Sequence, residues 1–252
     1  MEIKSVGLIP CRLASTRLKN KLVKKIADYP MFAHTYFKST QSNLDDVYVC
    51  TGDTEIINQC KELKINYIKT NRKHTNGTER CHEAAKILDL KKDDVIINIQ
   101  GDEPLVKKEN LNLLLEKFRY DSKVNLATLH KHQVSLKNYN DTKLVINSKN
   151  KVMYISRSDI PFSNEIIEKL VHIGIFCYDF KTLSEILKFE KTKLENNENI
   201  ELIRFLENDK NVFSYEVKNK LIGVDTLKEF NEVKEVIEND KKYLNSINIF
   251  YS

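Results

Sequence analysis

Asp94-Val-Ile-Ile-Asn-Ile-Gln-Gly-Asp-Glu-Pro104 is the stretch of this chain that decides its fold. Within it, Val95 to Ile99 form a short run of mostly β-branched apolar residues, which predicts a strand buried on both faces of a sheet. Two carboxylates, Asp102 and Glu103, follow Gly101 directly. Ligands of an open α/β sheet bind beyond the carboxyl ends of its strands, and a carboxylate placed there can hold Mg²⁺ through oxygen. The alternative interpretation is that Asp102 only begins the next helix as its N-cap.

Strands and helices alternate along the first half of the chain, on either side of this stretch. Strands are predicted at 5–10, 46–50 and 65–68, helices are predicted at 31–39 and 55–63, and a further helix leads into the quoted stretch. This alternation predicts a mainly parallel sheet with helices on both faces, and right-handed crossovers would bring its loops to one edge.

The second half of the chain is less regular. Strands predicted at 143–146 and 151–156 are joined by an Asn-Ser-Lys-Asn turn and form a hairpin. We expect this hairpin to belong to an antiparallel insertion at about residues 125–180. A helix is predicted at 198–207, and a last helix at 227–239.

Composition restricts the classes of protein to consider. The chain has 252 residues, of which 41% are hydrophobic and 31% charged, so we predict one globular domain over residues 1–252. No apolar run is long enough for a transmembrane helix, and the N-terminus lacks the apolar segment of a signal peptide, so we expect no membrane association and a cytoplasmic location. Five cysteines without CxxC spacing argue against a zinc site and a disulfide framework. The net charge of +5 comes from scattered lysines, which disfavours nucleic acid binding and suits a small anionic substrate.

A basic loop, Cys11 to Lys21, follows the first predicted strand. It contains two arginines, two lysines and two hydroxyl side chains. Arginine can bind phosphate oxygens through two N–H groups and lysine adds a point charge, so this loop suits a triphosphate. The loop contains neither a Walker A pattern nor a GxGxxG pattern. A solvated basic loop is the alternative interpretation.

A further carboxylate, Asp225, stands before the last predicted helix. We expect it at the end of another strand, and Thr226 and Glu229 fit a capping box that leaves Asp225 free of capping. Mg²⁺ commonly takes one or two carboxylates together with substrate phosphates. Asp102, Asp225 and the basic loop therefore predict a metal–triphosphate site, which would support phosphoryl or nucleotidyl transfer.

Six short motifs, in this order along nearly the whole chain, resemble those of one family. Each motif is weak alone, but six in sequence are specific. The family is that of the 3-deoxy-manno-octulosonate (KDO) cytidylyltransferases, or CMP-KDO synthetases. The motifs are Leu8-Ile-Pro-Cys-Arg-Leu-Ala-Ser-Thr-Arg-Leu18, Asn76-Gly-Thr-Glu-Arg80, Asn98-Ile-Gln-Gly-Asp-Glu-Pro104, Ser156-Arg-Ser-Asp-Ile-Pro161, His172-Ile-Gly-Ile175 and Gly223-Val-Asp-Thr226.

The resemblance implies a Rossmann-like nucleotidyltransferase fold and a homodimer. It also implies a reaction in which the anomeric hydroxyl of KDO, or of a close relative, attacks the α-phosphorus of CTP. The products would be the CMP-sugar, for lipopolysaccharide or capsule synthesis, and pyrophosphate. Mg²⁺ would offset the charge of the phosphates.

The motif positions carry implied roles in this reaction. Asp102 and Asp225 would bind Mg²⁺ and, together with Lys21, act in catalysis. The triphosphate would lie on Arg12, Ser15, Thr16, Arg17 and Lys21, and the cytidine would lie near Arg72 and Asn76. The sugar would lie among Arg80, Gln100, His172, Glu198, Glu201 and Arg204.

Four positions, in three segments of the chain, depart from the family pattern. Lys19-Asn20 replaces Pro-Gly before the loop lysine, Asn76 replaces a serine, and Leu202 replaces a glutamine expected to contact the sugar. A site built to hydrogen-bond a hydroxyl discriminates strongly, so loss of the glutamine can change the preferred sugar. A cytidylyltransferase for an amino-KDO or a nonulosonic acid, and a catalytically silent nucleotide-binding protein, therefore stay open as alternatives.

Overall fold

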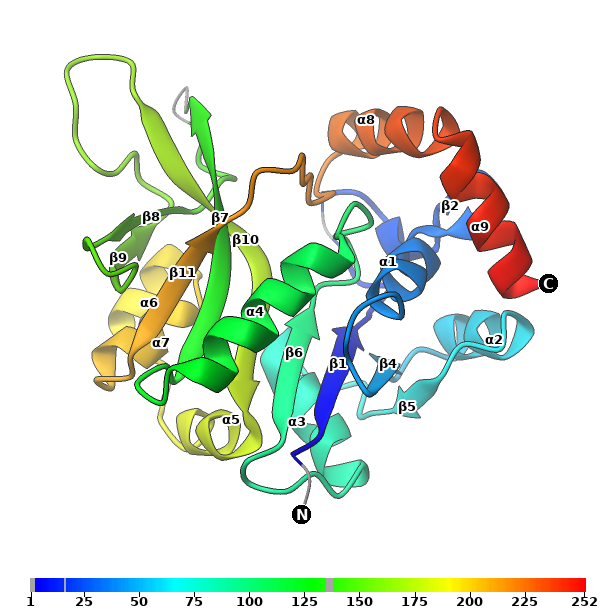
Figure 1. Ribbon diagram of the computed structural model, residues 1–252, viewed down its shortest axis with the longest axis horizontal. Coiled ribbons are helices and arrows are strands. Elements are labelled where there is room, and N and C mark those ends of the chain that lie inside the picture. The colour runs from blue at the N-terminus through cyan, green and yellow to red at the C-terminus, as the bar shows by residue number, and fades with distance from the viewer. Residues whose placement is uncertain (1–2, 16, 135–137) are drawn as a thin grey trace.

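A mixed sheet of nine strands forms the centre of the computed structural model, which describes residues 3–15, 17–134 and 138–252 (Figure 1). The main path of the sheet runs in the order β11-β7-β10-β6-β1-β4-β5, and the hairpin β8-β9 joins it at β10. The strands are β1 (Ser5–Pro10), β4 (Asp46–Thr51), β5 (Tyr67–Lys69), β6 (Val95–Ile99), β7 (Leu126–Val134), β8 (Lys143–Ile146), β9 (Val152–Ser156), β10 (Glu168–Asp179) and β11 (Val212–Glu216), with β2 (Lys25–Ile26) and β3 (Tyr29–Pro30) forming a separate ribbon.

Helices cover both faces of the sheet. One buried apolar cluster joins α1, α4 and α8 to one face, and a second joins α3, α5 and α7 to the other face. None of the helices in the described part of the chain has the length and apolar character needed to cross a bilayer. The helices are α1 (Met31–Ser39), α2 (Thr54–Glu62), α3 (Gly77–Ile87), α4 (Lys108–Tyr120), α5 (Phe180–Ile186), α6 (Lys193–Glu198), α7 (Leu202–Glu207), α8 (Leu227–Glu238) and α9 (Lys241–Tyr251), and a 3₁₀ turn spans Lys21–Val23.

Strand β6 explains why the stretch quoted first decides the fold. It pairs with β1 in parallel on one side and with β10 in antiparallel on the other. All five of its residues are buried, with Val95, Ile97 and Ile99 in the cluster under α1 and α4, and Ile96 in the opposite cluster. This confirms the strand predicted from the mostly apolar run, because a strand covered on both faces has no solvent-exposed side.

The two halves of the sheet differ in direction, as the sequence predicts. Strands β1, β4, β5 and β6 are mutually parallel, whereas β7, β8, β9 and β10 pair in antiparallel within residues 126–179. Since the carboxyl ends of β1 and β6 lie at one edge, the basic loop after β1 meets Asp102 after β6 there.

Three predictions about the second half are wrong. The helix expected at 198–207 is two helices, α6 and α7, because Asn199 takes a left-handed conformation (φ 53°) that ends α6. The expected strand before Asp225 is an irregular loop, and the helix at 227–238 is not the last, because α9 follows it.

The N-caps of α4 and α8 show that neither Asp102 nor Asp225 caps a helix. Helix α4 begins at Lys108 with Lys107 as its N-cap, so Asp102 does not cap it. The predicted capping box at α8 is confirmed, since the Glu229 N–H donates to Thr226 Oγ1 (3.3 Å) and the Thr226 N–H donates to Glu229 Oε2 (2.8 Å). Asp102 and Asp225 are thus both free for another role.

Helix α9 packs over α1, and a buried histidine lies between them. His34 Nε2 donates to the carbonyl oxygen of Ile26 (3.0 Å), so Nδ1 accepts from the hydroxyl of Tyr243 (2.7 Å). Burial lowers the pKa of His34 to about 4. The ring is therefore neutral in the folded protein, with both nitrogens satisfied.

We expect this histidine to make the fold sensitive to acid. Between pH 6.5 and about 4 the unfolded chain binds a proton at His34 that the folded chain does not bind, so the free energy of unfolding falls as the pH falls. At pH 5 this loss amounts to about 2 kcal/mol. Urea unfolding of His34→Gln at pH 7 and pH 5 should show a smaller difference than the wild type, and the exposed His132→Gln should not. An unchanged difference in His34→Gln would contradict the assignment.

Candidate active site

Two cavities lie side by side at the edge of the sheet where β1 and β6 end. The first, of about 280 Å³, lies against the loop after β1, and the second, of about 960 Å³, lies against β7, β10 and the loop before α8. Gln100, Asp102 and Asp225 line both cavities. A molecule held in one cavity would therefore meet a molecule held in the other at these three residues.

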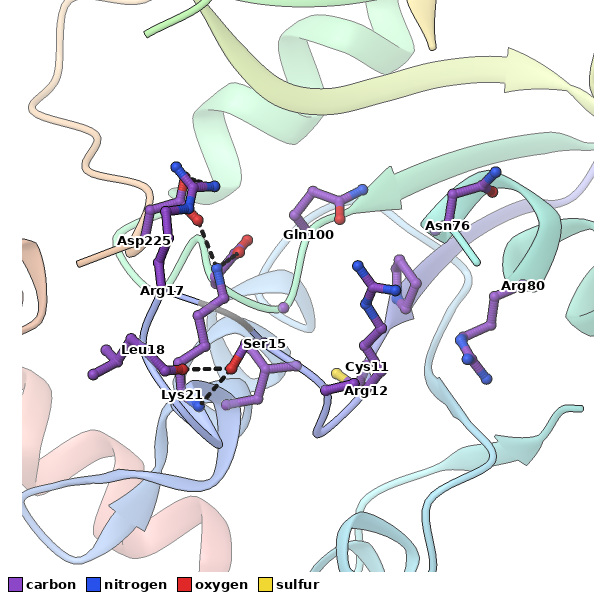
Figure 2. A pocket seen from close by; sticks show the side chains of 16 residues that line it. Cys11, Arg12, Ser15, Arg17, Leu18, Lys21, Asn76, Arg80, Gln100 and Asp225 are labelled. Carbon is purple, nitrogen blue, oxygen red and sulfur yellow. Dashed lines mark hydrogen bonds and ion pairs between the residues drawn. The ribbon is translucent and has the colours of Figure 1, made fainter. Parts of the chain in front are cut away.

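The first cavity is lined by cations from two parts of the chain. Arg12, Arg17 and Lys21 come from the basic loop, and Arg80 comes from α3. Figure 2 shows Arg17 and Lys21 on one side and Arg12 and Arg80 on the other. Arg12 donates to the carbonyl oxygen of Thr75 (2.8 Å), which directs its guanidinium along the cavity wall. Such a wall suits a polyphosphate.

Lys21 joins the two carboxylates that the sequence singles out. Its Nζ lies 2.5 Å from Asp102 Oδ2, 2.8 Å from Asp225 Oδ1 and 2.8 Å from the carbonyl oxygen of Val224. The other oxygen of Asp225 lies 2.9 Å from Arg17 Nη2. Burial alone would lower the pKa of Lys21, but the two carboxylates raise it above its ordinary value. Two cations and two anions thus balance one another here.

The carboxylates of Asp102 and Asp225 are close enough to share a single cation, because both contact the same ammonium group. Across residues 3–15, 17–134 and 138–252, no group of three or more His, Cys, Asp or Glu side chains is arranged to hold a metal. The chain therefore offers two oxygen ligands at this point. That number fits Mg²⁺, which completes its shell with water and substrate phosphates, better than Zn²⁺, which takes three or four protein ligands.

A loop rather than a strand brings Asp225 to this point. The Val224 N–H donates to the carbonyl oxygen of Asp102 (2.9 Å), which ties the loop to the end of β6. Beneath the loop lies Glu103, whose burial, with Asp102 nearby, raises its pKa to about 8. A Cβ atom on Gly223 would lie 2.8 Å from Glu103 Oε1, so only glycine lets the loop approach this closely.

The basic loop is held by its own side chains and by Asp53. Ser15 donates its hydroxyl hydrogen to the carbonyl oxygen of Leu18 and lines the first cavity. Asp53 Oδ2 accepts from the Leu13 N–H (2.8 Å). Thr16, the other predicted hydroxyl ligand, lies outside the described residues.

The two predicted cytidine ligands occupy different places. Asn76 lines the first cavity, and its side chain caps α3 by accepting from the Glu79 N–H (2.8 Å). Arg72 is largely exposed, pairs with Asp53 (3.3 Å) and is not among the residues that line the cavity. Their contacts with a nucleotide stay predictions.

Three residues predicted for the sugar lie at the cavities. Arg80 lines only the first cavity, Gln100 lines both, and His172 lines only the second. His172 Nε2 lies 2.8 Å from Thr128 Oγ1, and burial lowers the pKa of His172 to about 3. The imidazole is therefore neutral and acts only as a hydrogen-bonding group.

The other three residues predicted for the sugar contact protein groups instead and line neither cavity. Arg204 forms a buried bidentate pair with Glu195 (2.7 and 2.5 Å). Glu201 accepts from the hydroxyl of Thr78, and Leu202, beside it, is buried in the apolar core. Glu198 accepts from Ser156 Oγ (2.5 Å) and from the backbone N–H after it (2.9 Å). Their sugar contacts stay predictions.

Arg157 lines the second cavity and was not among the predicted residues. Its Nε donates to the carbonyl oxygen of Glu198 (2.9 Å), Nη1 to those of Tyr139 and Asn140 (both 3.3 Å), and Nη2 to that of Asn199 (3.4 Å). These acceptors are all neutral, so the guanidinium keeps its positive charge for an anion in the cavity. The motif at 156–161 contains this arginine, but the motif alone does not show which way the side chain points.

A basic pocket, two adjoining carboxylates and a second polar cavity at one sheet edge suit a nucleotidyltransferase. Comparison with known proteins agrees, since the family model for cytidylyltransferases matches residues 6–243. The chain belongs to the 3-deoxy-manno-octulosonate cytidylyltransferase family, the CMP-KDO synthetases.

The relatives cover nearly the whole chain. The 3-deoxy-manno-octulosonate cytidylyltransferase of Fusobacterium nucleatum is 38% identical over 94% of this chain and 98% of its own length. That of Koribacter versatilis is 35% identical over 93% of this chain and 90% of its own. The solved structure of a CMP:2-keto-3-deoxy-manno-octonic acid synthetase complexed with CTP superposes with a TM-score of 0.86 at 28% identity, covering 94% of this chain and 99% of that one.

Proposed function

We propose that this protein transfers the CMP group of CTP to the anomeric hydroxyl of KDO or a close relative and releases pyrophosphate. The observation that carries the proposal is the meeting of two cavities at Asp102 and Asp225, one lined by cations and the other larger and mainly polar. A transfer between two substrates needs both reacting groups held in line at one point.

The first cavity would hold the triphosphate of CTP. Arg17 and Lys21, which contact the carboxylates of Asp225 and Asp102 in the structure, would exchange these for phosphate oxygens. Arg12 and Arg80 would contact the phosphates from the opposite wall. Nucleotidyl transfer depends mainly on positioning and on charge neutralisation, and four cations supply both.

The second cavity would hold the sugar acid. Arg157 would pair with the sugar carboxylate, because its present partners leave its charge unbalanced. Gln100 lies at the junction of the cavities, where its amide can hydrogen-bond the sugar near the reacting hydroxyl. The hydroxyl loses its proton to solvent, and its oxygen forms a bond to the α-phosphorus as the bond from this phosphorus to the bridging oxygen breaks and pyrophosphate leaves.

Asp102 and Asp225 would hold Mg²⁺, because their two carboxylates are close enough to share one cation. When bound, Mg²⁺ would neutralise charge on the phosphates as the bond to pyrophosphate breaks. The carboxylates themselves would act as ligands, and Lys21, released from them, would donate to the departing pyrophosphate.

A panel of sugar acids tests the proposed substrate. With CTP and Mg²⁺ we expect pyrophosphate release with KDO or an amino-KDO at a kcat/KM at least ~100-fold above that with the nine-carbon N-acetylneuraminic acid. Pyrophosphate release measured without sugar is the control. A higher kcat/KM with the nine-carbon acid would show that a nonulosonic acid, not KDO, is the substrate. CTP binding without turnover on any sugar would indicate a catalytically silent nucleotide-binding protein.

A further inference from the structure

Lys143 is a lysine buried completely within the protein, on β8 beside the second cavity. Its Nζ donates to three carbonyl oxygens: that of Asn138 (2.8 Å), that of Asp141 (2.8 Å) and that of Arg157 (2.7 Å). An ammonium group has three N–H donors, so all of them are used on backbone atoms.

Burying the ammonium of Lys143 has a free-energy cost. Burial lowers the pKa of Lys143, because an ammonium loses hydration when it leaves water. Three hydrogen bonds to carbonyl oxygens offset the lost hydration. A neutral apolar side chain would fill the same space without any desolvation of a charge. What the ammonium adds is a fixed geometry between two backbone segments, the 138–141 loop and Arg157.

The positions joined by Lys143 belong to the wall of the second cavity. Asn138, Asn140 and Asp141 line it, as does Arg157. The guanidinium of Arg157 in turn donates to the carbonyl oxygens of Tyr139 and Asn140 (both 3.3 Å). The 138–141 loop and the arginine thus hold one another, and Lys143 fixes the backbone of both.

The same loop also reaches the first cavity. Asn140 Oδ1 accepts from Arg17 Nη1 (3.1 Å), and Arg17 contacts Asp225 (2.9 Å). This is one exposed contact of an arginine that also pairs with Asp225, so a shift of the loop should disturb the second cavity far more than the first.

We propose that Lys143 is a positioning residue for the sugar acid: its ammonium joins the 138–141 loop to the backbone of Arg157 and so aims the guanidinium into the second cavity. This inference rests on the proposed cytidylyl transfer to a sugar acid. Lys143 does not line the cavity, yet it would affect the affinity for the sugar acid.

Lys143→Met, which keeps the length and removes the donors, is the direct test. We expect the KM for the sugar acid to rise by about 10-fold or more, because small displacements of a binding group weaken it strongly. The KM for CTP should stay within about twofold of the wild-type value. Titration calorimetry with CTP verifies that the variant is folded, and Lys143→Gln is measured in the same way if the methionine variant is insoluble.

A neighbouring substitution and a double variant separate positioning from general loosening. Leu144 is the next residue on β8 and faces the apolar core, so Leu144→Ala should lower the melting temperature and leave the KM for the sugar acid unchanged. In Arg157→Ala, further replacement of Lys143 should add almost nothing to the rise in this KM, because Lys143 acts through Arg157.

Three results would overturn the inference. An unchanged KM for the sugar acid in the Lys143 variant is the first, and an equal rise in Leu144→Ala is the second. The third is a rise in the KM for the sugar acid, in the Lys143 and Arg157 double variant, equal to the product of the two single effects. If the wild type transfers CMP to no sugar acid, the proposed function fails and the inference fails with it, whereas wild-type turnover combined with any of the three results overturns the inference alone.

Discussion

Asp102→Asn and Asp225→Asn should each reduce kcat by about 10²- to 10³-fold, which is among the largest losses expected for this protein. Both carboxylates contact the ammonium of Lys21, at 2.5 and 2.8 Å, and both line the two cavities. A single amide at either position keeps the shape of the side chain but removes one of the two charges that would hold Mg²⁺. Pyrophosphate release at saturating CTP and sugar acid measures the loss.

Asp46→Asn is a suitable control for these two substitutions. Asp46 begins β4, far from both cavities, and makes a long surface ion pair with Lys4 (3.6 Å), so its replacement should leave kcat unchanged. Melting temperatures of all three variants show whether the fold is retained. Full activity in either Asp102→Asn or Asp225→Asn would remove that residue from the metal site.

The sequence predicts the part of the site whose position follows from the sheet. The β-branched run at 95–99 has to form a doubly covered strand, so the location of Asp102 follows from strand topology alone. The basic loop follows β1 for the same reason. Asp225 is different, because it reaches the site through the Val224–Asp102 backbone hydrogen bond and the close approach of Gly223 to Glu103. Such contacts between residues more than a hundred positions apart leave no periodic pattern to read.

The positions of Arg204 and Arg157 show the other limit of the sequence. A single helix at 198–207 would present Glu198, Glu201 and Arg204 along one face, at spacings of three residues. Asn199 breaks that helix, and Arg204 then pairs with Glu195 from the helix before the break. Arg157 faces the cavity instead, held by carbonyl oxygens from two distant segments. Neither the break nor these contacts has a strong local signal.

The contacts of Lys21 with both carboxylates also affect how the metal and CTP bind. Its ammonium and the guanidinium of Arg17 balance Asp102 and Asp225, so a divalent ion approaching the carboxylates meets a cation in contact with both. A triphosphate gives these cations a new anionic partner and thereby leaves the carboxylates free. Metal and CTP should therefore each strengthen the binding of the other.

Lys21→Met should separate these two effects of the lysine. Without the ammonium, kcat/KM for CTP should fall by about 10²- to 10³-fold, because a cation that contacts the phosphates is lost. In the same variant, binding of Mn²⁺ in the absence of CTP should become tighter by about 10-fold, because a competing positive charge a few ångströms away is removed.

Electron paramagnetic resonance of free Mn²⁺ measures that affinity directly, without any turnover. Lys19→Met is the matched control, since Lys19 is an exposed lysine of the same loop that lines neither cavity. If ligand-free Lys21→Met binds Mn²⁺ no more tightly than the wild type, the ammonium and the metal do not compete for the carboxylates. Lys21 would then act on the phosphates alone, and its contacts with Asp102 and Asp225 would persist throughout the reaction.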